Sequence, residues 1–373
     1  MLRFPVPRTE FLSDTYEKNV WHGKQVFKPA YSWADVNASL YGWDPADGLV
    51  RLYNGALIEP AEYTETILDT GLRRSRIVKD KLYDQLEQGA TLILNRLELK
   101  CPKVGALTHS IAQFVGEKAV ANGYASFGGK GAFERHWDTH DVFAVQLIGR
   151  KKWTVYEPTV PLPLPNQKSL GRKDECPALP AFECVLEAGD VLYLPRGWWH
   201  VTESFEKEET FHIAVGVHTP KVVDYAVWLC GQVMPKYQAS RCSVKFEDND
   251  VDVTEFAAEL VKQLARPENL KAFKEAVAAE TRSHTPFSIE RFASETSRVP
   301  PRAVLLNSPY QQTMSDGKLF SNGFQINIDE TSRAPLARIF AAQPAVPQAL
   351  MEEERLSQLL EELSKRDIVT VYR

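Results

Sequence analysis

The sequence predicts an α+β protein that begins with a jelly-roll barrel (a double-stranded β-helix) and continues with helices and a smaller α/β region. Short apolar runs rich in β-branched residues recur up to about residue 220, separated by glycine and proline. Apolar residues then change to helical spacing, and strand and helix patterns alternate again near the C-terminus. For a chain of 373 residues, we expect three domains: 1–220, 221–290 and 291–373.

The barrel core is expected from about residue 90 to 220, after an N-terminal α/β extension in which short apolar runs alternate with turn signals. Two of its strands flank Gly149 and are predicted to pair as a hairpin. The expected strands are residues 90–94, 121–127, 142–148, 152–156, 191–194 and 211–217.

The helical module is predicted from apolar residues at helical spacing, such as Val222, Tyr225 and Leu229. Pro267 interrupts the pattern, which resumes at Leu270. The apolar faces of these helices must be buried, either against the barrel or against a second copy of the chain. The sequence alone leaves both alternatives open.

The C-terminal region is expected to resemble a winged helix. Pro300-Pro301 indicates a linker, and strands at 324–328 and 367–372 enclose two helical segments. The segment Met351-Glu352-Glu353-Glu354-Arg355 is acidic where a recognition helix would be basic. We therefore expect a protein-contact or scaffolding role for this region and no direct binding of nucleic acid.

Composition and charge are those of a water-soluble globular protein, with 44% hydrophobic and 25% charged residues. The net charge of −5 gives no global positive field for wrapping nucleic acid. The first residues lack the apolar core of a signal peptide, and no apolar stretch is long enough to span a bilayer. The five cysteines are odd in number, irregularly spaced and without a Cys-x-x-Cys pair, which favours reduced thiols and a cytoplasmic location.

A candidate metal site begins with His136-x-Asp138. On an extended strand, side chains two residues apart face the same way, so both could approach one ion. His200 follows a Gly-Asp-x-Leu-Tyr-Leu-Pro segment that could carry it across the barrel to that ion. Two imidazoles and one carboxylate form the facial triad of non-haem Fe(II) oxygenases, which leaves coordination positions open for cosubstrate and dioxygen.

Two further histidines compete for roles near this site. His140 would share a strand face with His136 and Asp138, and we expect it to be a polar neighbour of the ligands. His212 lies on the strand after His200, where it is either a hydrogen-bonded core histidine or a contact to cosubstrate or substrate.

The motifs resemble the JmjC-type 2-oxoglutarate oxygenases, specifically the cupin-4 branch that contains the bacterial and human ribosomal oxygenases. The order of barrel, helical module and winged-helix-like region is also similar. The matching segments are Asn122-x-Tyr124, His136-Trp137-Asp138-Thr139-His140-Asp141-Val142-Phe143, Gln146-x-x-Gly149-x-Lys151-x-Trp153 and Gly189 to His200.

This resemblance implies an enzyme that uses Fe(II), 2-oxoglutarate and O2, releases succinate and CO2, and hydroxylates a substrate C–H bond. It implies that His136, Asp138 and His200 bind the metal and that Lys151 pairs with the distal carboxylate of the cosubstrate. Lys151 in Arg150-Lys151-Lys152 is otherwise a solvated hairpin lysine. Asn122 and Tyr124 match positions that line the cosubstrate pocket.

One position departs from the family pattern. Many relatives carry a small hydroxyl residue three positions before the first metal histidine, and here that position is Phe133. The hydrogen bond from that hydroxyl to the distal carboxylate of the cosubstrate is then absent, or Tyr124 or Ser126 supplies it. The segment 161–181, rich in proline and charge, is either a lid or substrate-facing loop, or a disordered surface excursion.

The resemblance implies a protein side chain as substrate, such as an arginine or histidine of a ribosomal protein, and a homodimer. A peptide or small molecule of a biosynthetic pathway is an alternative substrate for the same chemistry. A catalytically silent cupin that binds ligands or regulates is an alternative of another class, against which the intact triad and Lys151 argue.

Overall fold

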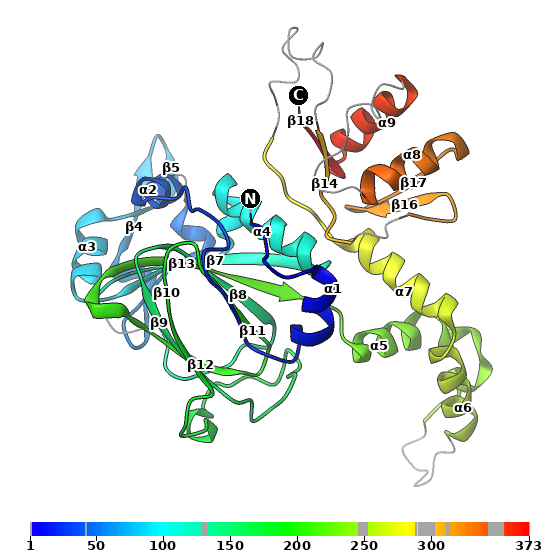
Figure 1. The fold of residues 1–373 in the computed structure, drawn as a ribbon, viewed down its shortest axis with the longest axis horizontal. Coiled ribbons are helices and arrows are strands. Elements are labelled where there is room, and N and C mark those ends of the chain that lie inside the picture. The colour runs from blue at the N-terminus through cyan, green and yellow to red at the C-terminus, as the bar shows by residue number, and fades with distance from the viewer. Residues whose placement is uncertain are drawn as a thin grey trace. The chain divides into compact units, whose positions relative to one another are not determined.

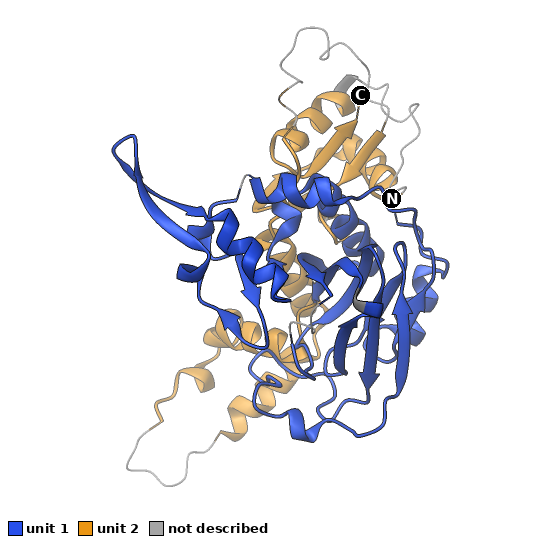
Figure 2. Cartoon of the chain, turned by 90° about the vertical axis from the view of Figure 1, so that its left-hand side faces the viewer, with its two compact units in different colours: residues 1–218 blue, residues 219–373 orange. Residues whose placement is uncertain are grey.

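The computed structural model describes residues 2–41, 43–128, 133–244, 253–287, 289, 303–310, 314–341 and 354–372. The chain divides into two compact units, residues 1–218 and 219–373 (Figure 2). The expected linker at Pro300-Pro301 lies outside the described residues. The division of the second unit at residue 290 stays a prediction.

The first unit is built around an eight-stranded sheet in the order β1-β11-β8-β13-β7-β6-β2-β3. Figure 1 labels β7, β8, β11 and β13 of this sheet. Neighbouring strands run antiparallel, and β13 pairs with β7 over ten positions from Glu209↔Phe127 to His218↔Lys118. The strands are β1 (Trp21–Gly23), β2 (Val50–Tyr53), β3 (Leu57–Ile58), β6 (Thr91–Leu94), β7 (Lys118–Phe127), β8 (Asp141–Ile148), β11 (Val191–Leu194) and β13 (Glu209–His218).

A second sheet of three strands has the order β10-β9-β12. Its strands are β9 (Lys151–Tyr156), β10 (Phe182–Leu186) and β12 (Trp199–Ser204). In β9, buried residues alternate with half-buried ones from Lys151 to Val155, as expected for a sheet with one covered face, whereas β12 is buried only at Trp199 and His200. The predicted α+β class with a barrel core is confirmed.

The predicted hairpin across Gly149 is wrong. β8 pairs with β11 and β13, whereas β9 pairs with β10 and β12, so the two strands belong to different sheets. Gly149 has φ +64°, and a Cβ there would lie 2.1 Å from the Glu209 carbonyl oxygen. Glycine thus allows the chain to pass close to Glu209 as it leaves the main sheet for the small sheet. The prediction failed because a glycine between two strand-like runs is equally typical of a hairpin turn.

Helices and a separate two-stranded hairpin, β4 with β5, complete this unit. Helix α4 begins with Pro102 at its first turn and ends at Gly116, whose φ of +81° stops the helix. These elements are α1 (Arg8–Glu10), a π-turn (Phe11–Thr15), α2 (Trp33–Tyr41), β4 (Thr64–Asp69), β5 (Leu72–Ile77), α3 (Lys79–Glu87) and α4 (Pro102–Val115).

An aromatic cluster joins the N-terminal segment to the main sheet. The ring of Phe11 lies 5.8 Å from that of Phe143 on β8 and 5.1 Å from that of Tyr193 on β11. All three side chains are almost fully buried. Burial of such rings contributes roughly 1.5–3 kcal/mol each, so residues 11–17 are held firmly against the barrel.

The second unit contains two groups of elements. Tyr225, Leu229 and Phe273 are the buried contacts among helices α5 (Val222–Gln232), α6 (Thr254–Leu264) and α7 (Pro267–Glu280). A separate core holds the remaining elements together. These are β14 (Ala303–Leu306), β15 (Met314–Ser315), β16 (Lys318–Ser321), β17 (Phe324–Asn327), α8 (Glu330–Ala341), α9 (Glu354–Lys365) and β18 (Val369–Tyr372), with β14 paired to β18. Across the described helices, none has the length and apolarity needed to cross a bilayer.

Candidate metal centre

His136, Asp138 and His200 converge as the sequence predicts. One ligand atom from each lies within 4.8 Å of the others, and this is the one such group of histidine, cysteine and acidic residues found among the described residues. The His200 Nε2 atom is 3.6 Å from Asp138 Oδ2, and the two imidazole centroids are 4.3 Å apart.

Backbone hydrogen bonds between two segments place these side chains. The N–H of His136 donates to the carbonyl of His200 at 3.1 Å, and the N–H of His200 donates back at 2.8 Å. Gly197 donates to the carbonyl of Asp138 at 3.0 Å. The expectation that His136-x-Asp138 starts a strand is wrong, because His136 forms an isolated bridge and β8 begins only at Asp141. The bridge to His200 replaces the expected strand.

Nδ1 of both histidines already forms a hydrogen bond within the protein. The Nδ1–H of His136 donates to the Glu134 carbonyl at 2.8 Å, and that of His200 donates to the Trp198 carbonyl at 3.1 Å. A carbonyl only accepts, so each Nδ1 carries the proton and each Nε2 has its lone pair free. Metal-binding histidines are oriented in this way in most proteins.

The electrostatics favour the protonation states that a metal needs. Burial and the neighbouring His136 lower the pKa of His200 to about 4, so its imidazole is neutral at neutral pH. Burial opposes ionisation of Asp138, but the adjacent His200 and His136 outweigh it and lower the pKa of this carboxyl. A neutral imidazole and an ionised carboxylate are the forms that coordinate a cation.

The three side chains open into a cavity of about 240 Å³ between the two sheets. The main sheet contributes residues of β6, β7, β8 and β13, and the small sheet contributes residues of β9 and β12. The lining residues are Thr91, Tyr124, Phe133, His136, Asp138, Val142, Lys151, Trp153, His200, Thr202, His212 and Ala214.

Lys151 is the unusual member of this lining. Its side chain is 2% exposed, and no carboxylate within the described part of the chain forms an ion pair with it. Burial lowers the pKa of its amine to about 8. The neighbouring Arg150 and Lys152 instead pair with glutamates at the surface, with Glu208 and Glu183 respectively. Lys151 is therefore a buried cation without an ion-pair partner among the residues that the structure describes.

Three further polar atoms of the cavity lining are buried without a hydrogen-bond partner. They are the Thr91 hydroxyl, the Trp153 indole nitrogen and Nδ1 of His212. The His212 ring stacks on Tyr124 at 5.0 Å, and burial together with Lys151 lowers the pKa of His212 well below its usual value. Because unpartnered buried polar atoms are costly, this part of the cavity is suited to a polar ligand.

The other predicted site residues lie as follows. Tyr124 lines the cavity, whereas Asn122 is not among the lining residues and its side-chain oxygen accepts the Arg96 backbone N–H at 3.1 Å. Ser126 is also outside the lining, 3.1 Å from the Ser204 hydroxyl. Phe133 does line the cavity, with its ring 5.3 Å from that of His136.

His140 is not on a strand face with the ligands, contrary to expectation, because residues 137–140 are not a strand. Its ring lies 5.0 Å from that of His218 and does not join the converging group. Thr91 and Thr202 also line the cavity, and neither was predicted from the sequence as a site residue. A polar residue inside the apolar run 90–94 was the available signal for Thr91.

The segment 161–181 is attached to the residue between the first two candidate ligands. The Trp137 indole N–H donates to the Gln167 carbonyl at 3.1 Å, and the Ser169 hydroxyl donates to the Trp137 carbonyl at 3.0 Å. The Arg172 guanidinium lies 4.9 Å from the Trp137 ring centroid. These contacts hold the segment beside the candidate metal site.

Comparison with known proteins identifies the domain that carries this site. Residues 101–225 match the family model described as JmjC domain. This segment is similar to JmjC domains and contains His136, Asp138 and His200. Ribosomal oxygenase 1 of Gallus gallus is 30% identical over 186 residues, which are 50% of this chain and 30% of the relative. The bifunctional lysine-specific demethylase and histidyl-hydroxylase NO66 of Caenorhabditis elegans is 36% identical over 168 residues, 44% of this chain and 22% of the relative.

The chain thus spans less than a third of the length of these two curated relatives. A solved structure of YcfD, a ribosomal oxygenase from Escherichia coli, in complex with cobalt and 2-oxoglutarate, is similar over 100% of this chain and 99% of that chain. The TM-score is 0.60 at 16% identity, so this similarity establishes the fold. The predicted relationship to JmjC ribosomal oxygenases is confirmed, and the JmjC domain holds the His-x-Asp…His triad.

Proposed function

We propose that this protein is an Fe(II)- and 2-oxoglutarate-dependent oxygenase that hydroxylates a protein side chain. The observation that carries the proposal is that one cavity is lined by three convergent ligands and by a buried lysine without an ion-pair partner among the described residues. The ligands fit a divalent metal, and the lysine fits the carboxylate of an organic acid.

The metal would be held by Nε2 of His136, Nε2 of His200 and a carboxylate oxygen of Asp138. Both imidazoles have their Nδ1–H committed to backbone carbonyls, which fixes the rings with Nε2 available. Three protein ligands on one side of an ion leave positions for exchangeable ligands. The donor set therefore fits Fe(II), the metal that the resemblance to JmjC oxygenases implies.

The distal carboxylate of 2-oxoglutarate would pair with Lys151. A buried cation is stable only with a fixed anion or several acceptors, and no carboxylate of the described residues forms an ion pair with Lys151. The hydroxyls of Thr91 and Thr202 line the same cavity and would provide the hydrogen bonds that the Phe133 position cannot provide. Tyr124 and His212 would contact the cosubstrate, with Asn122 supporting Tyr124 from the neighbouring position on β7.

When bound, Fe(II) supplies the oxidation by which 2-oxoglutarate, O2 and a substrate C–H bond become succinate, CO2 and a hydroxylated carbon. The residues of this chain orient the participants. Lys151 fixes one end of the cosubstrate, Val142, Trp153 and Ala214 exclude water from the cavity, and Phe133 packs beside His136. Exclusion of water protects a reactive centre from unproductive turnover.

The proposed substrate is a side chain of a ribosomal protein, an arginine or a histidine. The relatives that share the JmjC domain are named as ribosomal oxygenases, and one is named as a histidyl-hydroxylase, which supports this class. The segment 161–181, fixed to Trp137, is proposed to face the substrate. A peptide or small-molecule substrate is the second candidate, since a cavity of about 240 Å³ also accommodates small acids.

The decisive experiment measures succinate formation and the mass of the substrate. His136→Ala and Asp138→Ala should abolish turnover of 2-oxoglutarate with iron, whereas binding without succinate would indicate the silent cupin. Ribosomal proteins from a deletion strain should lack about 16 Da on one residue, the mass of the oxygen that the reaction adds. Identical ribosomes in both strains would favour the small-molecule substrate.

We also propose that the helices of the second unit form a homodimer. Val222, Val223 and Val227 of α5 are 85%, 45% and 67% exposed, while Tyr225 and Leu229 are buried within the unit. This leaves α5 with an apolar stripe that a second copy would cover. The region 291–373 is proposed as a winged-helix-like, protein-contacting domain, supported by the α8–α9 pair and the β16–β17 hairpin. Residues 351–353 of its acidic segment lie outside the described residues.

A cytoplasmic location is proposed on the state of the thiols. Cys101, Cys176, Cys184, Cys230 and Cys242 are all free. Free thiols are typical of reducing compartments.

A further inference from the structure

Two buried charged residues connect the segments that carry the metal-site side chains. Asp141 is the first residue of β8, three positions after Asp138, and Arg196 lies in the turn that leads to His200. Asp141 is fully buried and Arg196 is 6% exposed. Arg196 Nη1 donates to Asp141 Oδ2 at 3.2 Å, and the Arg196 backbone N–H donates to Oδ1 at 3.3 Å.

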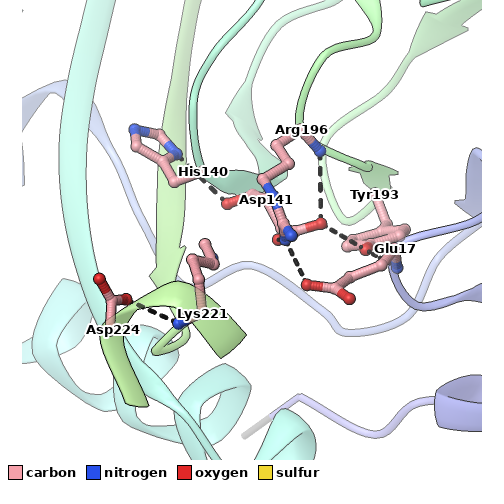
Figure 3. Close-up of polar contacts among 7 residues, drawn as sticks. All are labelled: Glu17, His140, Asp141, Tyr193, Arg196, Lys221 and Asp224. Carbon is pink, nitrogen blue, oxygen red and sulfur yellow. Dashed lines mark hydrogen bonds and ion pairs between the residues drawn. The ribbon is translucent and has the colours of Figure 1, made fainter. Parts of the chain in front are cut away.

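Tyr193 and Glu17 complete the network, and Figure 3 shows the four side chains pointing toward one another. The Tyr193 hydroxyl donates to Asp141 Oδ1 at 2.9 Å and accepts the Glu17 backbone N–H at 2.8 Å. Arg196 also donates to the Glu17 carboxylate. The guanidinium is thus held from one side by the barrel and from the other by the N-terminal segment.

Stability alone does not explain such a network. Removing two charges from water costs about as much as their attraction returns, so buried ion pairs contribute little net free energy compared with apolar residues. What this hydrogen-bonded charge pair provides is a fixed direction for the Arg196 side chain, which is held through Nη1 and not through Nε. Such a network is therefore expected beside a group of side chains whose relative positions must be fixed. The nearest such group is the triad of His136, Asp138 and His200.

The contacts follow one another in order along the two segments. His136 and His200 exchange two backbone hydrogen bonds, Gly197 donates to the Asp138 carbonyl, and Arg196 pairs with Asp141. The first two contacts fix the ends near the histidines. Without the third, the stretch from Asp138 to Asp141 could shift against the turn, and the 3.6 Å separation of Asp138 and His200 would no longer be set.

We propose that Asp141 and Arg196 are positioning residues that hold Asp138 and His200 in register for a divalent metal without touching it. Glu17 and Tyr193 fix Arg196 in this role. The inference rests on the proposed function only in that a metal binds at the triad.

The test uses the full chain, Co(II) as the probe, and two variants of the network. Asp141→Asn removes the charge at constant shape and should weaken Co(II) binding about 10- to 100-fold, the range found for residues that orient metal ligands. It should also change the Co(II) visible absorption spectrum. Glu17→Gln acts on Arg196 from the more exposed side, where Glu17 is 31% exposed, and should cause a smaller loss in the same direction.

The matched control is Glu65→Gln, which breaks the exposed Arg76–Glu65 pair of 2.6 Å on the β4–β5 hairpin. It should leave the Co(II) affinity and spectrum unchanged. Wild-type affinity and spectrum in both network variants would overturn the proposal, whatever their melting temperatures. If Asp141→Asn does not fold, Glu17→Gln decides the question alone.

Amide exchange of the metal-free protein gives a readout that does not depend on metal binding. Peptides covering residues 195–204 should exchange faster in the network variants than in wild type, and unchanged exchange would overturn the proposal. If wild type itself fails to bind Co(II), the proposed function fails, and the exchange data still test whether these residues hold the two segments together.

Discussion

Replacing Lys151 with methionine should make the protein more stable and its cosubstrate binding weaker. Lys151 is 2% exposed, and burial lowers the pKa of its amine from 10.5 to about 8. That difference corresponds to about 3 kcal/mol of unfavourable burial of the charged form. Methionine has a similar length and no charge, so below pH 8 the variant should gain up to about 3 kcal/mol in free energy of unfolding.

The pH dependence tests the cause of this gain. Because the folded pKa lies below the unfolded one, the unfolded chain binds more protons between pH about 8 and 10.5. The contribution of Lys151 to the free energy of unfolding should therefore rise with pH across that window, and the rise should be absent from Lys151→Met. Urea denaturation at pH 7.5, 9 and about 10 measures it.

Binding of 2-oxoglutarate should change in the opposite direction. Truncating one member of a buried charge pair costs about 2 kcal/mol or more, so the dissociation constant should rise about 30-fold or more. Calorimetry with Co(II)-loaded protein measures this. Lys152→Met is the matched control, because Lys152 is 43% exposed and pairs with Glu183 at 3.3 Å, and both quantities should stay near wild type. A Lys151→Met protein that is less stable and binds 2-oxoglutarate normally would refute the reasoning.

Three other predictions concern stability and assembly. His109 is mostly buried, its Nε2 atom has no hydrogen-bond partner, and burial lowers its pKa to about 4. The free energy of unfolding should therefore fall as pH drops from about 6.5 to 4. His109→Leu should flatten this part of the pH dependence measured by urea denaturation. Gly197→Ala should destabilise the protein by at least about 2 kcal/mol in thermal unfolding, because φ is +88° and the new Cβ would lie 2.4 Å from the Val160 carbonyl oxygen. Gly171→Ala should cost less, because Gly171 also has a positive φ but has open space around it. Val227→Asp should convert a dimer to a monomer in light scattering, and an unchanged mass would count against dimerisation through α5.

The sequence predicted β6, β7, β8, β9, β11 and β13 because the signals of these strands are local, and it did not predict β10 and β12 of the small sheet. Runs such as 142–148 and 211–217 are apolar, β-branched and bounded by turn residues, and they appear as β8 and β13. The pairing across Gly149 was mispredicted because a turn signal says that the chain reverses and does not say into which sheet it goes. Pairing is decided by distant strands, which a single sequence does not reveal.

The candidate site shows the same division between local and distant information. The spacing and the Gly-Asp-x-Leu-Tyr-Leu-Pro segment predicted that His136, Asp138 and His200 share one site. They converge because of a backbone bridge between positions 136 and 200, and not because they share a strand face. Thr91 and Thr202 were missed because each contributes one polar atom to a cavity formed by two sheets. The polar position inside the apolar run 90–94 is a weak signal for Thr91, since a threonine in a strand is common on any half-buried surface.

The energetics of the cavity argue that ligand binding and folding are coupled in this protein. Without ligands, the cavity lining contains a buried lysine without an ion-pair partner among the described residues, three polar atoms without partners, and the neutral imidazole of His200 beside the carboxylate of Asp138. Each feature opposes folding, because a polar group removed from water without a partner costs on the order of 1–3 kcal/mol. A metal and a dicarboxylate would satisfy these groups together, since the cation uses the imidazoles and Asp138 while the acid uses Lys151 and the free donors. Each ligand should therefore raise the melting temperature, and the two together should raise it more than either does alone.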